Sequence, residues 1–120
     1  MRDYKKMNVW EKSYKFGIHI YSITKPFPKE EMYGLTSQLR RAAISIPSNI
    51  AEGSRKSTQK DFRSFLYNAY GSGAEMEVQI MFAKDLGYIT PQMCTSLLNE
   101  LSEVMKMLNS LIQKISLEIV

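Results

Sequence analysis

The 120-residue sequence has a single cysteine and a single histidine, and it contains no long run of apolar residues. One cysteine, Cys94, cannot form a disulfide within the chain, so a reducing compartment such as the cytoplasm is expected. It falls in an apolar helical pattern, which predicts a buried core thiol. No stretch of about 18 apolar residues occurs, which excludes a membrane-spanning helix. The charged start MRDYKKMNVWEK also lacks the apolar segment of a signal peptide.

The residues of common catalytic sites are also scarce. His19 lies beside apolar residues of a predicted helix, and no Cys/His cluster has the spacing of metal ligands. The "GSG" at residues 71–73 lies inside a helical pattern and lacks the lysine of a phosphate-binding loop. Glu75 and Glu77 are two residues apart and point to different sides of a helix. The sequence therefore predicts no catalytic residues, no cofactor and no metal.

What is present is the composition of a globular protein, with 44% hydrophobic and 23% charged residues. The length predicts one domain, residues 1–120. Net charge is +4 but uneven, because residues 1–60 carry a balance of +7 and residues 61–120 one of −3. This asymmetry indicates either an anionic partner or head-to-tail attraction between subunits, and ordinary solvation of helix faces is the third interpretation.

Turn and cap signals divide the chain into four helices. The first is predicted over 9–25 and ends at Pro26 and Pro28. The second is predicted from Lys29, with Glu30 and Glu31 in its first turn, to Gly53. The third starts after the cap Thr58, with Asp61 in a weak capping box, and ends at Gly87. The fourth starts with Thr90 and Pro91 and runs to near the C-terminus.

Apolar residues in the third and fourth helices alternate steps of four and three, which is typical of left-handed bundle packing. The third helix has this seam at Phe62, Leu66, Ala69, Gly73, Met76, Ile80 and Ala83, and the fourth at Leu97, Leu101, Val104, Leu108, Leu111 and Ile115. Short connections make consecutive helices antiparallel. The predicted fold is all-α, an up-down-up-down antiparallel four-helix bundle.

Pro47 lies in the middle of the second helix. The seam Leu39, Ala43, Ile46, Ile50 passes through it in phase. We therefore predict a continuous, kinked helix in which a nearby Ser or Asn side chain donates to the carbonyl freed near Ala43.

Three helices carry more apolar residues than one seam needs. The surplus residues are Trp10, Tyr14, Ile18 and Tyr21 in the first helix, Tyr67, Tyr70, Met81 and Phe82 in the third, and Met93, Leu98, Met105 and Ile112 in the fourth. Large exposed apolar patches usually mark interfaces, so a homo-oligomer is expected, with a broad core as the alternative. The run Gly71–Glu75 predicts close backbone approach at a helix crossing.

Basic residues gather on and just after the second helix. Arg41, Ser48 and Arg55 are seven apart and form a stripe opposite the seam, with Arg40 on the neighbouring flank. The predicted nucleic-acid-binding residues are Arg40, Arg41, Arg55, Lys56, Lys60 and Arg63. No aromatic platform for base stacking accompanies them, so sequence-independent contacts to phosphates are expected. A solvated face with Glu52 as partner is the alternative.

The motifs "FPKEEMYGL", "QLRRAAISIPSNIAEG" and "GSGAEMEVQI" resemble those of the 23S rRNA-intervening-sequence proteins, a family of small four-helix bundles encoded within bacterial ribosomal RNA genes. The resemblance covers residues 9–88. It extends to accessory proteins of diversity-generating retroelements, which form pentameric barrels with a basic surface.

The resemblance implies a four-helix bundle, a pentamer, and RNA or DNA as partner, and by analogy a reverse transcriptase. It assigns no activity, and no membrane is involved. Two functions follow as hypotheses: an accessory nucleic-acid-binding homo-oligomer, or a protein-interaction scaffold with no nucleic-acid role.

Overall fold

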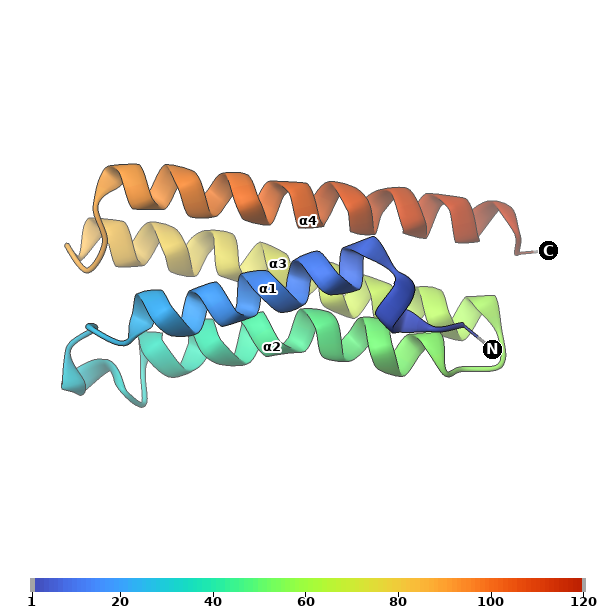
Figure 1. Cartoon of the computed structure of the whole chain (residues 1–120), viewed down its shortest axis with the longest axis horizontal. Coiled ribbons are helices and arrows are strands. Elements are labelled where there is room, and N and C mark those ends of the chain that lie inside the picture. Colours follow the sequence, from blue (N-terminus) through green and yellow to red (C-terminus); the bar gives the residue numbers. More distant parts are fainter. Residues whose placement is uncertain (1, 120) are drawn as a thin grey trace.

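A computed structural model describes residues 2–119. It contains four long helices: α1 (Asn8–Thr24), α2 (Leu35–Ser54), α3 (Gln59–Asp85) and α4 (Pro91–Leu117). Two short 3₁₀ turns, η1 (Tyr4–Lys6) and η2 (Lys29–Glu31), precede α1 and α2. Consecutive helices run in opposite directions along a body of 48 × 23 × 20 Å (Figure 1). The predicted all-α, up-down-up-down bundle is confirmed.

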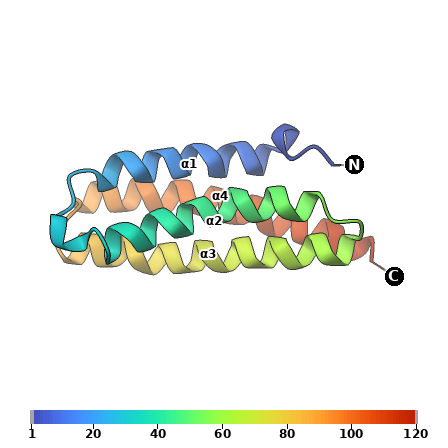
Figure 2. The ribbon, with the colours of Figure 1, turned by 90° about the horizontal axis from the view of Figure 1, so that it is seen from below.

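The four helices stand at the corners of a square. Figure 2 shows α1 and α3 at opposite edges, with α2 and α4 between them. Each neighbouring pair is in contact, whereas α1 and α3 lie diagonally and do not pack on each other. The outer sides of α1 and α3 therefore face away from each other.

The core follows the predicted seams. All seven predicted seam positions of α3 are buried, and in α4 only Leu111 is partly exposed. Cys94 is also buried, as expected. Two residues predicted to lie outside the α4 seam, Met105 and Ile112, are buried instead. Met105 fills the space that Gly73 leaves on α3, where a Cβ would overlap its sulfur. The close approach predicted for the "GSG" run is therefore of a different kind, because a side chain of α4, and not its backbone, packs against Gly73.

The start of α2 differs from the prediction. Lys29–Glu31 form a 3₁₀ turn, and the α-helix begins only at Leu35, after Gly34. Glu31 Oε1 accepts a hydrogen bond from Leu35 N at 3.0 Å, and its Oε2 accepts one from the Tyr88 hydroxyl at 2.8 Å. These bonds, from Leu35 first and Tyr88 second, lower the pKa of Glu31, and the same carboxylate raises the pKa of Tyr88. Glu31 therefore caps α2 from outside the helix.

The predicted boundaries of α3 and α4 are confirmed. The hydroxyls of Thr58 and Thr90 accept hydrogen bonds from the amides of Asp61 and Met93, both at 3.1 Å. Gly87 follows α3 with a φ of 80°, the left-handed conformation that glycine adopts without strain. Within residues 2–119, none of the helices combines the length and hydropathy needed to cross a membrane.

Helix α2 continues through Pro47, as predicted, with Ile46 and Ile50 fully buried. The acceptor differs from the prediction, because the Asn49 side chain donates through Nδ2 to the carbonyl of Ser45, at 2.8 Å, and not to that of Ala43. The Ala43 carbonyl faces α1, where a Cβ added to the buried Gly17 would lie 3.6 Å from its oxygen. The carbonyl that the proline frees therefore lies at the contact between α1 and α2.

Arg40 ties the end of α1 to α2. Its Nε donates to Thr24 Oγ1 at 2.8 Å and its Nη2 to the carbonyl of Tyr21 at 3.3 Å. The guanidinium also lies over the Tyr21 ring, 4.6 Å from its centroid. A cation at a helix C-terminus is favourable, because the last carbonyls have no partner within the helix.

Two buried helical glycines give a matched test of packing. A Cβ at Gly53 would lie 2.7 Å from Phe65 Cβ and 3.3 Å from the Phe62 carbonyl, atoms that cannot move aside easily. Gly53→Ala should therefore lower the free energy of unfolding by about 1–3 kcal/mol. Gly17→Ala meets only ordinary contacts and should raise it by about 0.5–1 kcal/mol through helix propensity. Urea unfolding measures both, and equal effects would contradict the packing described for α2 and α3.

Alanine substitutions of the neighbouring Arg40 and Arg41 give a second matched test of stability. Arg40→Ala removes two hydrogen bonds at the end of α1 and should cost about 1–2 kcal/mol of stability. Arg41→Ala changes an exposed side chain and should stay within about 0.5 kcal/mol of the wild type. Thermal unfolding followed by circular dichroism compares them, and a larger loss for Arg41→Ala would reverse the assignment.

Candidate nucleic-acid interface

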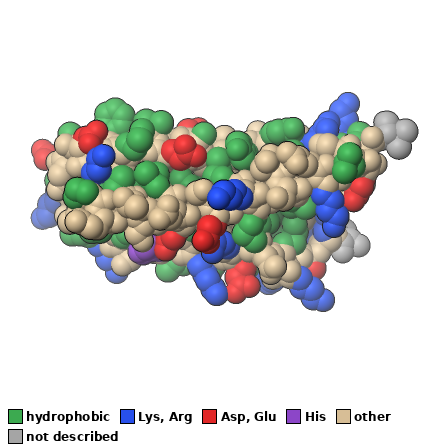
Figure 3. Space-filling model, turned by 90° about the horizontal axis from the view of Figure 1, so that it is seen from above, with side chains coloured by type: hydrophobic (Ala, Val, Ile, Leu, Met, Phe, Trp, Pro, Cys, Tyr) green, Lys and Arg blue, Asp and Glu red, His purple; other side chains and the backbone are tan. Residues whose placement is uncertain are grey.

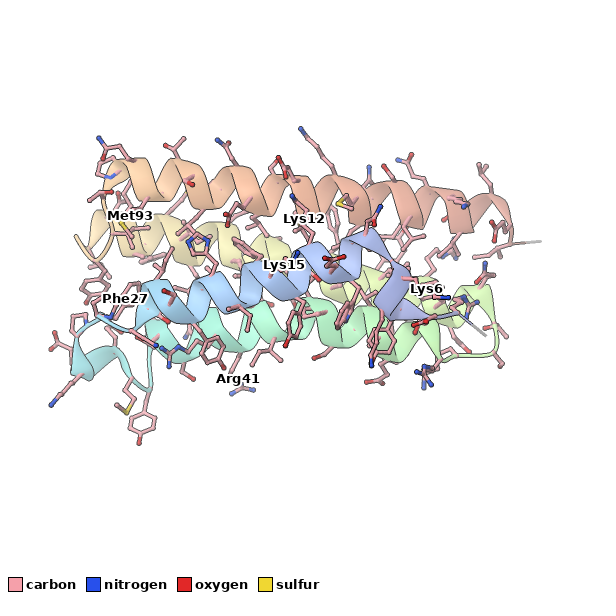
Figure 4. All side chains as sticks on the ribbon, viewed as in Figure 1. Lys6, Lys12, Lys15, Phe27, Arg41 and Met93 are labelled. Carbon is pink, nitrogen blue, oxygen red and sulfur yellow. The ribbon has the colours of Figure 1, made fainter. Side chains whose placement is uncertain are left out.

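One end of the bundle gathers lysines and arginines from segments that are far apart in the sequence. The N-terminal residues before α1 lie here beside the connection between α2 and α3 and the first turns of α3 (Figure 1). We call this region the basic end, and its members are Arg2, Lys5, Lys6, Arg55, Lys56, Lys60 and Arg63. Figure 3 shows Lys and Arg side chains at this end, and Figure 4 labels Lys6 among them.

Arg2 fastens the N-terminal segment to the α2–α3 connection. Its Nη1 donates to the carbonyls of Ser54 at 3.2 Å and Lys56 at 2.8 Å. Its guanidinium lies over the Phe62 ring, 4.5 Å from the centroid. The Ser54 carbonyl is at the C-terminus of α2, where a cation is favoured. Arg2 thereby brings Lys5 and Lys6 to the same end as Arg55 and Lys56.

Aromatic rings support the two exposed cations of the α2–α3 connection. The Arg55 guanidinium is 5.6 Å from the centroid of Tyr4, and Lys56 Nζ is 5.1 Å from that of Phe65. Such contacts restrict the side chains without neutralising them. Arg2, Arg55, Lys56 and Ser57 line a hollow on this surface. It offers positive charge and one hydroxyl, the groups that bind a phosphate.

The charges of the basic end have no acidic partner among residues 2–119. Ion pairs in this part of the chain lie elsewhere. Lys12–Glu103 at 2.5 Å joins α1 to α4, Lys15–Glu11 lies within α1, and Lys84–Asp85 lies within α3. The acidic side chains near the basic end have other contacts. Asp3 accepts from the Lys5 amide, and Glu118 accepts from Gln59. The seven cations of the basic end outnumber its carboxylates, Asp3, Asp61 and Glu118, so this end carries a net positive charge, which attracts polyanions.

The six residues predicted from the sequence to bind nucleic acid lie in three different places in the structure. Arg55, Lys56 and Lys60 are exposed at the basic end. Arg63 is there too, but it is half-buried and donates to Ser116 Oγ of α4 at 3.1 Å. Arg40 is held at the end of α1.

Arg41 is exposed on α2, as Figure 4 shows, about 21 Å along the helix from Arg55 at 1.5 Å per residue. It lines a shallow groove with Ser45 and Ser48, so the predicted stripe on α2 does face solvent. The stripe is thus separate from most of the basic end, which it meets only at Arg55.

Sequence reasoning missed Arg2, Lys5 and Lys6. Their positive charge is visible in the start "MRDYKKM", but the pattern does not indicate which part of the fold the segment joins. Nothing in that pattern shows that the segment folds back onto a loop more than 50 residues away, as the Arg2–Ser54 bond requires.

The remaining titratable groups form no cluster of metal ligands within residues 2–119. His19 Nδ1 lies 2.9 Å from Glu100 Oε2 at the rim between α1 and α4. A hollow beside this pair is lined by Lys12, Lys15, Phe16, His19 and Glu100. His19 therefore lies at the rim of the bundle, half-buried between α1 and α4.

Comparisons with known proteins agree with the fold. The crystal structure of a protein of unknown function from the S23 ribosomal protein family of Bacteroides thetaiotaomicron is similar to this chain, with a TM-score of 0.80 and 26% sequence identity. The similarity covers 88% of this chain and 95% of that one. No curated protein shows a significant match. The family model described as 23S rRNA-intervening sequence protein matches residues 5–110, nearly the whole of the four-helix body. The chain therefore belongs to the family of 23S rRNA-intervening sequence proteins.

Proposed function

We propose that the protein is a non-catalytic accessory factor that binds RNA or DNA through the basic end and works as a homo-oligomer in the cytoplasm. The observation that carries the proposal is the gathering of seven lysines and arginines at one end, none of them in an ion pair among residues 2–119. Ordinary surface cations are more often interspersed with carboxylates, as between α1 and α4 of this bundle.

Lys5, Lys6, Arg55, Lys56 and Lys60 are the proposed phosphate contacts, because their side chains are exposed. Arg2 positions this group, since its donors are occupied by backbone carbonyls. Arg41 extends the surface along α2 towards the middle of the bundle. Arg40 and Arg63 hold helices together, and we assign them supporting roles.

Contacts of this kind give affinity without sequence preference. Lysine and arginine bind phosphate oxygens that are the same for every base, and reading base edges needs side chains that enter a groove. A homo-oligomer, with five copies as the family resemblance implies, would present several basic ends to one strand. Individually weak contacts would then add through multivalency. A reverse transcriptase is a further partner by analogy with the retroelement accessory proteins.

Binding should depend steeply on salt. For a single strand, log K is expected to fall with log salt by roughly 0.7 for each phosphate contact. Lys56→Glu with Lys60→Glu should lower affinity at least tenfold at low salt and reduce this slope by about 1.4, because two contacts are lost. Fluorescence anisotropy with a labelled single-stranded RNA and a structured RNA measures both quantities.

The chain offers a control with the same change in charge. Lys25 and Lys29 are exposed and four residues apart, like Lys56 and Lys60, but they lie at the opposite end of the bundle. Lys25→Glu with Lys29→Glu should keep most of the affinity. Equal losses in both double variants would show a nonspecific effect of net charge. If neither RNA binds the wild type at low salt, the interaction scaffold becomes the better hypothesis.

A further inference from the structure

The basic end contains aromatic rings as well as cations. The sequence predicts no aromatic platform beside its basic residues, and here the structure differs, because the rings come from other segments. The N-terminal segment brings Tyr4 next to Arg55, and the first turns of α3 bring Phe65 next to Lys56. Arg55 and Lys56 line the hollow at this end, so both rings lie beside it. A positively charged groove with aromatic side chains is typical of sites for single-stranded nucleic acid.

Tyr4 is held in a fixed position. It opens the turn η1, which Asp3 caps by accepting a hydrogen bond from the Lys5 amide at 3.1 Å. The Tyr4 carbonyl accepts a hydrogen bond from the Met7 amide at 2.9 Å. Its ring packs on that of Trp10, with the centroids 5.1 Å apart and the planes inclined by 67°. A ring that is already ordered in this way loses little conformational entropy when a ligand binds to it.

Arg55 is held less firmly than Tyr4. Its guanidinium lies 5.6 Å from the Tyr4 centroid, close to the limit of about 6 Å for a cation–π contact. The side chain is exposed and is in no ion pair within residues 2–119, even with Glu52 three residues before it. Stacked bases are about 3.4 Å apart, so a base between the ring and the guanidinium needs about 6.8 Å. An outward movement of this exposed arginine by roughly 1–2 Å opens that space.

Exposed lysines lie next to both groups. Lys5 and Lys6 follow Tyr4 in the chain, and Lys56 follows Arg55. An ammonium group binds the phosphates of a strand, whereas an aromatic ring and a flat guanidinium stack on the face of a base. The basic end therefore has groups for both parts of a nucleotide.

We propose that the basic end binds a single strand by stacking one unpaired base between the Tyr4 ring and the Arg55 guanidinium, while the lysines hold the neighbouring phosphates. The inference rests on the proposed function and names its substrate class, which is a strand with unpaired bases. In a duplex both faces of each base are already stacked, so a duplex offers this site only phosphates. Every base has a π-face, so single strands of RNA and of DNA both fit.

Strands that differ only in their bases test the inference. Fluorescence anisotropy compares a labelled DNA strand of about 12 thymidines with a strand of the same length whose residues are abasic. The bases should tighten binding about fivefold or more at equal salt, as expected for one stacked base. The dependence of log K on log salt should be the same for both strands, because their phosphate contacts are the same. A uridine RNA strand of this length should show the same gain over the abasic strand.

Substitutions at the two stacking groups locate the base. Tyr4→Ala should bind the thymidine and abasic strands equally, whereas Tyr4→Phe keeps the ring and should keep the gain. Arg55→Lys keeps the charge and the salt dependence but should lower the gain, because an ammonium group lacks the flat face of a guanidinium. Tyr33 is 93% exposed at the opposite end of the bundle, so Tyr33→Ala is the matched control and should bind like the wild type. Circular dichroism checks that every variant keeps its helical content.

Trp10 gives an independent signal, because it is the only tryptophan and its ring contacts Tyr4. Its emission should change when the thymidine strand is added and stay constant with the abasic strand. Unchanged emission with the thymidine strand would overturn the inference, as would equal affinity of the wild type for the two strands or a full gain in Tyr4→Ala. In each of these cases binding to phosphates, and with it the proposed function, still holds. If no strand binds at low salt, the proposed function fails and the inference fails with it.

Discussion

The bundle depends on one constraint, which is that four helices must bury one continuous seam of apolar residues. Steps of four and three keep the seam of α3 on one side of the helix over 27 residues. Residues such as Leu66, Met76 and Leu101 are fully enclosed. Burial of this apolar surface provides most of the stability, and the polar contacts at the helix ends decide where each helix begins and ends.

Close packing at the seam also explains why the helices contain a proline and two buried glycines, residue types that weaken an isolated helix. Pro47 stays within α2 because its neighbours Ile46 and Ile50 are both buried, so interrupting the helix would expose them. Gly53 and Gly73 admit bulky side chains from a facing helix, Phe65 in one case and Met105 in the other. Both glycines weaken a helix locally and are compensated by contacts between helices.

The two ends of the bundle differ in the contacts that hold them and in their charge. The end that holds η2 and the α3–α4 loop is fastened by the Glu31–Tyr88 hydrogen bond. The opposite end is fastened by Arg2 and is left with unpaired positive charge. Along the sides, α1 and α3 carry exposed aromatic and aliphatic side chains, such as Ile18 and Phe82.

The sequence by itself determined the helices, because their signals are local. Seam spacing, the caps Thr58 and Thr90, Gly87 and the phase through Pro47 all act within a few residues, and the structure agrees with each. The exposed Arg55, Lys56 and Lys60 could also be identified this way. Only the tertiary structure decided the rest. The hydrogen bond between Tyr88 and Glu31, 57 residues apart, accompanies the late start of α2 at Leu35. Met105 is buried because it packs against Gly73 of α3. In the tertiary structure Arg40 donates a hydrogen bond to Thr24 at the end of α1. Arg2 donates to the carbonyl of Ser54, 52 residues away, and so holds Lys5 and Lys6 at the basic end. Such contacts depend on which helices become neighbours, and no pattern within one segment contains that information.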